Sequence, residues 1–129
     1  PALRRAGGGA IVTTASVSGL TPHLIDPVYA ATKAAVVNLT RSLVFLEKED
    51  GIRINCVCPG LVRTPLAAHS AERFDQDDRE NFEARRAGMS ELPALVPDDI
   101  AAAVLKLIKD DTINGKAYWI VLGQEDELR

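Results

Sequence analysis

The segment Ile52–Gly60 reads IRINCVCPG and decides the fold. A run of apolar and β-branched residues that ends at Pro59-Gly60 is typical of a strand, because these two residue types interrupt strand pairing. Upstream, Ala10–Thr14 (AIVTT) follows three glycines and suits a strand that is buried on both faces. Downstream, Asn114-Gly115 turns the chain into a third predicted strand, Ala117–Leu122.

Helical patterns separate these three strands. Helix formers run from Val28 to about Lys48, and Gly51 is placed to end that helix. Pro97-Asp98-Asp99 opens another helix, from Ile100 to about Lys109, with acidic residues at the end that the helix dipole favours. The alternation predicts an α/β fold with a doubly wound, Rossmann-like parallel sheet and crossover helices.

Length and composition narrow the classes of function. The chain has 129 residues, so residues 1–129 are expected to form one domain or part of one. With 26% charged residues and a formal net charge of -3, the chain has no feature of a nucleic-acid partner. No apolar run approaches the roughly 20 residues that span a bilayer, and no secretion signal is recognisable, so a cytoplasmic protein is expected.

Both cysteines lie in the strand predicted at residues 52–60. Cys56 and Cys58 flank a single residue. Alternate residues of a strand lie about 6.5 Å apart along it, which is beyond comfortable disulfide reach. We therefore expect reduced, buried thiols, and without a nearby histidine or further cysteine we expect no metal site.

The stretch VYAATKAAV, residues 28–36, places a phenol and an ammonium four residues apart. On a helix, Tyr29 and Lys33 would share one face, with the ammonium within about 6 Å of the phenol. A neighbouring cation favours the ionised phenol, which can then exchange a proton with an alcohol or a carbonyl. Thirteen residues before Tyr29, Ser16 stands at the end of the first strand, where active sites of parallel sheets collect.

These motifs resemble those of the short-chain dehydrogenase/reductase family. Ser16, the Tyr29-x-x-x-Lys33 pair and the segment PGLVRT (59–64) match the family in identity, order and spacing. The resemblance covers nearly the whole chain and is to the C-terminal half of the family's domain. It implies an NAD(P)-dependent oxidoreductase that interconverts a secondary alcohol and a ketone by hydride transfer.

The resemblance also implies a role for each matched residue. Tyr29 would be the general acid/base, and Ser16 would orient and polarise the substrate oxygen. Lys33 would promote ionisation of Tyr29 and hydrogen-bond the nicotinamide ribose, to which Tyr29 also lies close. The wall around the nicotinamide would be formed by Pro59, Gly60, the backbone of Val62 and the hydroxyl of Thr64.

The resemblance further implies a cofactor and partners. NAD or NADP would be the cofactor, and the tail DDTINGKAYWIVLGQ (110–124) is similar to prostaglandin-dehydrogenase-like members, which favours NAD. The substrate would be a small alcohol or carbonyl compound. The helix that starts near Tyr29 resembles the one through which family members pair, so the complete protein would form a homodimer or homotetramer.

The family's glycine-rich nucleotide-binding turn is missing from these 129 residues. We therefore expect the chain to be the C-terminal catalytic part of a single Rossmann-like domain, inactive on its own because the N-terminal nucleotide-binding half is absent. The alternative is a catalytically silent remnant that at most dimerises through the long helix. A glycine-rich segment upstream of Pro1 would separate the two hypotheses.

Several residues keep more than one interpretation. Residues 67–90 are either a solvated helix or a mobile cover over a pocket, and the resemblance to a substrate lid makes Leu66, Phe74 and Phe82 candidates for pocket or lid positions. His23 and His69 are isolated in polar loops, where an acid/base role is open for His23 because it lies between Ser16 and Tyr29. Core or edge packing is expected for Tyr118 and Trp119.

Overall fold

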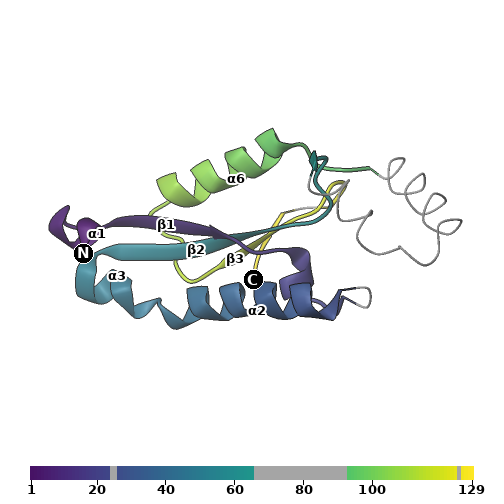
Figure 1. Cartoon of the computed structure of the whole chain (residues 1–129). Helices are drawn as coiled ribbons and strands as arrows, with labels where there is room; N and C mark the ends of the chain where they lie inside the picture. The colour runs from purple at the N-terminus through teal and green to yellow at the C-terminus, as the bar shows by residue number, and fades with distance from the viewer. Residues whose placement is uncertain (24–25, 66–92, 125) are drawn as a thin grey trace, which may run out of the picture.

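The structure is a computed structural model that describes residues 1–23, 26–65, 93–124 and 126–129. Helices separate the three parallel strands, with helix α2 on one face of the sheet and helix α6 on the other (Figure 1). In chain order the elements are α1 (Ala2–Arg5), β1 (Gly9–Thr14), the 3-10 helix η1 (Val17–Gly19), α2 (Pro27–Ser42), α3 (Phe45–Asp50), β2 (Ile52–Pro59), α6 (Pro97–Lys109), β3 (Ala117–Ile120) and β4 (Glu127–Leu128).

The sheet has the order β1-β2-β3-β4. Strands β1 and β2 run parallel in the register Gly9↔Ile52 to Thr14↔Val57, and β3 continues parallel to β2. The short β4 returns antiparallel to β3. The predicted α/β fold with a mostly parallel sheet is confirmed, whereas β4 was not predicted and β3 is shorter than the expected strand.

The helix predicted from Val28 to about Lys48 is two helices, and that prediction was wrong. Helix α2 ends at Ser42, and α3 starts at Phe45 after a short turn. The turn is held by a distant side chain, because the amide of Asn114 donates to the Val44 carbonyl at 3.0 Å. Gly51 ends α3 in the left-handed conformation, as predicted (φ 67°).

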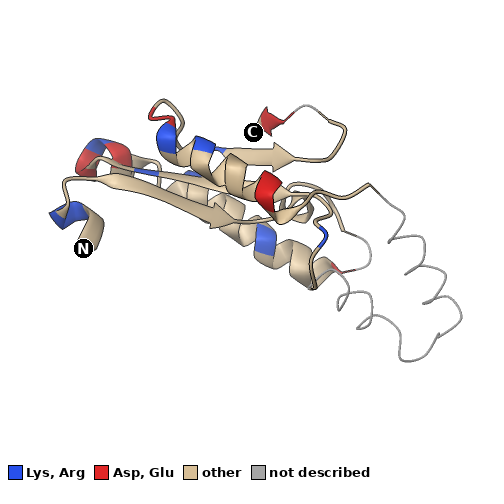
Figure 2. Cartoon of the chain, turned by 90° about the horizontal axis from the view of Figure 1, so that it is seen from above, with Lys and Arg blue, Asp and Glu red and all other residues tan. Residues whose placement is uncertain are grey.

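Helix α6 starts at Pro97, where the Asp99 carboxylate accepts from the backbone N–H of Val96 at 2.8 Å. Its acidic residues lie in the first turn and its lysines in the last turn, as Figure 2 shows. This distribution complements the helix dipole at both ends. No helix in the four described ranges is long and apolar enough to cross a membrane.

Two apolar clusters cover the two faces of β2. On one face Val57, Leu107 and Tyr118 belong to a cluster between the sheet and α6. On the other face Cys56 and Cys58 pack with Val37 of α2. Both cysteines are free and buried, with 4.0 Å between their sulfur atoms, so the prediction of reduced buried thiols is confirmed.

Polar side chains of β2 tie the strand to its surroundings. Asn55 is fully buried, donates to the Ile113 carbonyl at 2.9 Å and accepts from the Lys116 N–H at 3.0 Å. The guanidinium of Arg53 donates to three carbonyls at and beyond the end of α6, those of Leu107, Ile108 and Ile113. These bonds satisfy helix-end carbonyls that would otherwise lack partners.

We predict that Asn55→Ala destabilises the protein by about 2–4 kcal/mol, because the Lys116 N–H loses its acceptor, the Ile113 carbonyl keeps only the bond from Arg53, and a small cavity replaces a fully buried side chain. Urea unfolding followed by circular dichroism would measure the change. The exposed Asn38 on α2 provides the control, since Asn38→Ala should change stability by less than about 0.5 kcal/mol. Equal effects of the two substitutions would contradict the role of Asn55.

Candidate active site

The first turn of α2 carries Tyr29. Asp26 precedes the helix, Pro27 opens it, and the Asp26 carboxylate accepts from the Tyr29 N–H at 2.8 Å. A side-chain acceptor at this position is a strong N-cap. The Tyr29 side chain starts at the carboxyl edge of the sheet, and the residue is 38% exposed.

Lys33 lies one helical turn after Tyr29. Its ammonium is 5.6 Å from the centre of the Tyr29 ring, so the two residues share one helix face as the spacing predicts. The same ammonium donates to the Thr14 carbonyl at the end of β1, at 3.1 Å. Lys33 therefore connects the helix that carries Tyr29 to the edge of the sheet.

Ser16 follows β1 and begins the 3-10 helix η1. It is 8% exposed, and its hydroxyl oxygen accepts from the Ser18 N–H at 3.2 Å. Gly19 ends η1 against the backbone of α2: a Cβ there would lie 2.7 Å from the Lys33 carbonyl. Gly19 was not predicted as a site residue. Its lack of a side chain lets η1 approach α2 and brings Ser16 to the side of the sheet where Lys33 lies.

The segment after β2 folds against β3 and the residues before α6. Gly60 donates its N–H to the Ile120 carbonyl at 2.8 Å, while Val62 forms a parallel bridge with Leu95. The Thr64 hydroxyl donates to the Val62 carbonyl at 3.5 Å, and Pro59 is buried at the end of β2. Pro59 thus ends β2, and Gly60, Val62 and Thr64 follow it at the sheet edge where Ser16 follows β1.

The thiols of β2 lie under this edge. The hydrogen bond with Cys56, together with burial, raises the pKa of the Cys58 thiol. Cys58 therefore remains protonated and acts as a small apolar side chain behind Ser16. Within the described ranges, no group of three His, Cys, Asp or Glu side chains could hold a metal ion.

His23 lies against the candidate site. Its ring makes an edge contact with Tyr29, with 6.4 Å between ring centres and 66° between the ring planes. Its Nδ1 accepts from the Asp26 N–H at 3.0 Å. The positions proposed for a lid (Leu66, Phe74, Phe82) and His69 lie outside the described residues.

A separate cleft of about 380 Å³ lies between α6 and the chain after β3. Its wall includes a network that the sequence did not indicate, in which Lys106 donates to the Tyr118 hydroxyl at 2.8 Å and this hydroxyl donates to Asp126 at 3.1 Å. The bond with Tyr118 raises the pKa of Lys106.

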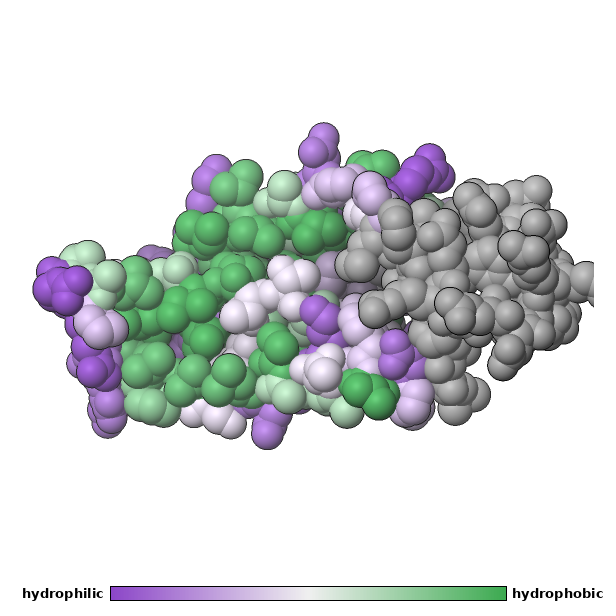
Figure 3. Space-filling view, in the orientation of Figure 1, coloured by the Kyte–Doolittle hydropathy of each residue, from purple (hydrophilic) through white to green (hydrophobic). Residues whose placement is uncertain are grey.

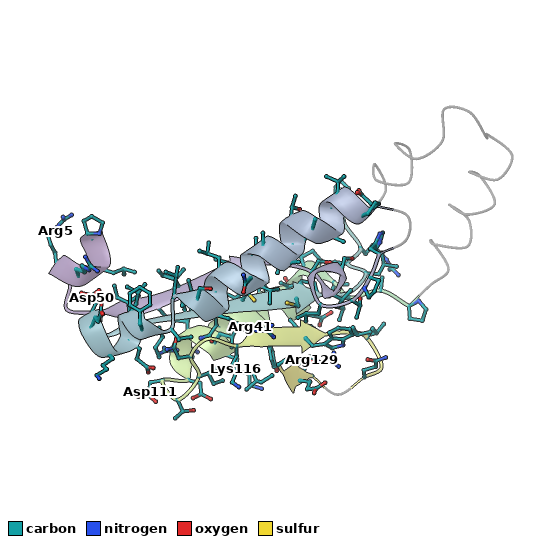
Figure 4. All side chains as sticks on the ribbon, turned by 90° about the horizontal axis from the view of Figure 1, so that it is seen from below. Arg5, Arg41, Asp50, Asp111, Lys116 and Arg129 are labelled. Atoms are coloured by element: carbon teal, nitrogen blue, oxygen red, sulfur yellow. The ribbon has the colours of Figure 1, made fainter. Side chains whose placement is uncertain are left out.

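Tyr118 is buried in the core, as predicted. Trp119 is half-buried under the guanidinium of Arg129, which lies beside β3 (Figure 4).

A family model described as short chain dehydrogenase matches residues 1–75. The match covers more than half of the chain and includes Ser16, Tyr29, Lys33 and the segment 59–64. The match lies in the N-terminal part of this chain. It therefore does not show that the chain is the C-terminal half of the family's domain, as was expected from the sequence.

Curated relatives extend the match. The chain is 35% identical over 112 residues to the 15-hydroxyprostaglandin dehydrogenase (NAD+) of Rattus norvegicus, covering 84% of this chain and 42% of the relative. It is 42% identical over 109 residues to the meso-2,3-butanediol dehydrogenase of Serratia marcescens, covering 83% of this chain and 41% of that relative. The chain thus spans less than half the length of these relatives.

Solved structures share the fold. Levodione reductase superposes with a TM-score of 0.80 at 30% identity, over 95% of this chain and 48% of that protein. The L-sorbose reductase from Gluconobacter frateurii, complexed with NADPH and L-sorbose, gives a TM-score of 0.71 at 28% identity, over 91% of this chain and 47% of that protein. The α/β arrangement around the candidate site is therefore that of known reductases.

We predict that Asp26→Ala destabilises α2 and lowers the free energy of unfolding by about 1 kcal/mol, because the N–H of Tyr29 loses its acceptor. Asp26→Asn keeps a side-chain oxygen and should retain most of the stability. Urea unfolding of the two variants would test the difference, and equal losses would show that the cap is not what holds the start of α2.

Proposed function

The chain belongs to the short-chain dehydrogenase family, and on that premise we propose that it carries the catalytic residues of an NAD(P)-dependent oxidoreductase. The reaction is the interconversion of a secondary alcohol and a ketone. The observation that carries the proposal is the position of the Lys33 ammonium 5.6 Å from the Tyr29 ring, on the sheet edge where Ser16 begins η1.

Three side chains have separate roles in the proposed reaction. Tyr29 is the general acid/base, because its exposed phenol can meet a substrate oxygen. Ser16 holds that oxygen in place by a hydrogen bond. Lys33 places a positive charge 5.6 Å from the phenol ring, and its ammonium can exchange its bond with Thr14 for a ribose hydroxyl.

The residues present fit a nicotinamide cofactor. Gly60 closely adjoins the backbone of Ile120 and the side chain of Val121, so the turn after β2 is compact and can form a flat wall. Pro59, Gly60, Val62 and Thr64 would form that wall, and Tyr29 and Lys33 would hold the ribose. When bound, the cofactor supplies or accepts the hydride.

The proposed cofactor is either NAD or NADP. One relative is named for NAD+ and one solved structure holds NADPH. The likeness of the tail to the first of these favours NAD. The substrate is a small alcohol or carbonyl compound, in keeping with relatives named for a hydroxyprostaglandin and a butanediol.

We also propose that residues 1–129 are the C-terminal catalytic part of one Rossmann-like domain whose nucleotide-binding half lies elsewhere in the protein. Strand β1 is at the edge of the described sheet, although its apolar and β-branched residues are typical of a strand that is covered on both faces inside a parallel sheet. In the view of Figure 1, β1 lies between α6 and α2, and Figure 3 shows hydrophobic residues gathered over this region. The edge of β1 is the place where the rest of the sheet would join.

Helix α2 offers a surface for a second subunit. Leu39 is 56% exposed on this helix, and Ala31 and Ala35 are exposed on it as well. A small, apolar helix face suits packing against a second copy. A homodimer or homotetramer of the complete enzyme is the proposed assembly.

We predict that Tyr29→Phe in the complete enzyme lowers turnover by at least about 100-fold, because the phenolic proton donor is lost. Cofactor affinity, measured by titration of nucleotide fluorescence, should fall far less than turnover, because Lys33 and the wall after β2 still hold the nucleotide. Tyr118→Phe is the matched control, since it removes a phenol from the opposite face of the sheet and should keep turnover. Undiminished activity of Tyr29→Phe would refute the assigned role.

The proposed sheet edge has its own test, by amide hydrogen exchange. In β1 the odd-numbered residues pair with β2, since Gly9 and Ala15 donate their N–H groups to Gly51 and Val57. The Val12 amide therefore faces the free edge. We predict rapid exchange at Val12 in the isolated chain and slow exchange in the complete protein, whereas equal rates would exclude a neighbouring strand.

A further inference from the structure

The imidazole of His23 is held beside Tyr29 by a hydrogen bond from the chain that leads into α2. The Asp26 N–H binds its Nδ1, and the Asp26 carboxylate binds the N–H of Tyr29. Its ring also contacts Tyr29 directly, with 6.4 Å between ring centres. Thus one residue, Asp26, orients the imidazole and the start of the helix that carries Tyr29.

The bond at Nδ1 determines which ring nitrogen carries the hydrogen. A nitrogen that accepts a hydrogen bond must present its lone pair, so neutral His23 has its hydrogen on Nε2. Among the described residues, none accepts a hydrogen bond from Nε2, and the His23 side chain is half-buried. The imidazole therefore has one unused donor close to Tyr29.

The neighbouring polar groups already have roles in the proposed reaction or in the fold. The ammonium of Lys33 donates to Thr14, and the hydroxyl of Ser16 accepts from Ser18. In the proposed reaction, Tyr29 and Ser16 bind the oxygen on the reacting carbon. A donor at His23 then suits a second oxygen of the same small molecule.

We propose that His23 is a specificity-determining residue that donates from Nε2 to a second oxygen near the reacting carbon. The inference rests on the proposed oxidoreductase function and names its substrate class: vicinal diols and α-hydroxy ketones, in preference to simple secondary alcohols and ketones. A site that hydrogen-bonds a substrate hydroxyl discriminates against an analogue that lacks it, because the site's donor then stays unpaired.

The kinetic test compares trans-1,2-cyclohexanediol with cyclohexanol in the complete enzyme. His23→Phe keeps an aromatic ring against Tyr29 but removes the donor, so the ratio of kcat/KM for the diol to that for the alcohol should fall by about tenfold or more, mainly through KM for the diol. His23→Gln restores an N–H donor and should recover part of the ratio. The exposed Thr21, on the same loop, gives the control Thr21→Ala, which should keep the ratio. An unchanged ratio in His23→Phe would overturn the proposal.

A binding test separates this inference from the proposed function. In protein labelled with 15N-histidine, the Nε2 signal of His23 should show the Nε2–H tautomer and shift on addition of 2-hydroxycyclohexanone but not of cyclohexanone. That response without any turnover would refute the oxidoreductase and retain the His23 site. An Nδ1–H tautomer, or equal shifts with both ketones, would overturn the His23 inference even in an active enzyme.

Discussion

The burial of β2 on both faces is the constraint on which the rest of the structure depends. A buried strand must satisfy every polar group without water, and β2 does so with its own side chains as well as its ladder bonds. Asn55 binds the loop before β3, and Arg53 binds the carbonyls at the end of α6. The strand, the loop and the helix are thereby held in one arrangement, from which the carboxyl ends of the strands emerge at a common edge.

The candidate site follows from that common edge. Asp26 sets where α2 starts, and Gly19 lets η1 lie against the same helix. Lys33 then reaches across to the last carbonyl of β1. The contacts of Gly19 and Lys33 each join α2 to another element, so the proposed catalytic side chains are positioned by the packing of the fold and not by the loops alone.

Local patterns predicted the parts of this structure that depend on local interactions. The alternation of strands and helices predicted the sheet and its crossovers, and the four-residue spacing predicted that Tyr29 and Lys33 share a helix face. The turn between α2 and α3 was missed because Asn114, 70 residues away, binds Val44. Strand β4 was missed for a similar reason, since a strand of two residues carries no periodicity and forms only through pairing with β3.

The bond between Lys33 and Thr14 has a consequence for any strand that lies beside β1. The Thr14 carbonyl faces the outer side of the sheet, because the odd-numbered residues of β1 pair with β2. An incoming strand that donates to this carbonyl must share it with the ammonium, which already takes up one of its two lone pairs. Lysine at a sheet edge is also a common guard against unwanted strand addition. The ammonium that lies beside the phenol thus also covers the last carbonyl on the outer edge of β1, which makes this end of the edge less open to pairing with a strand of another molecule.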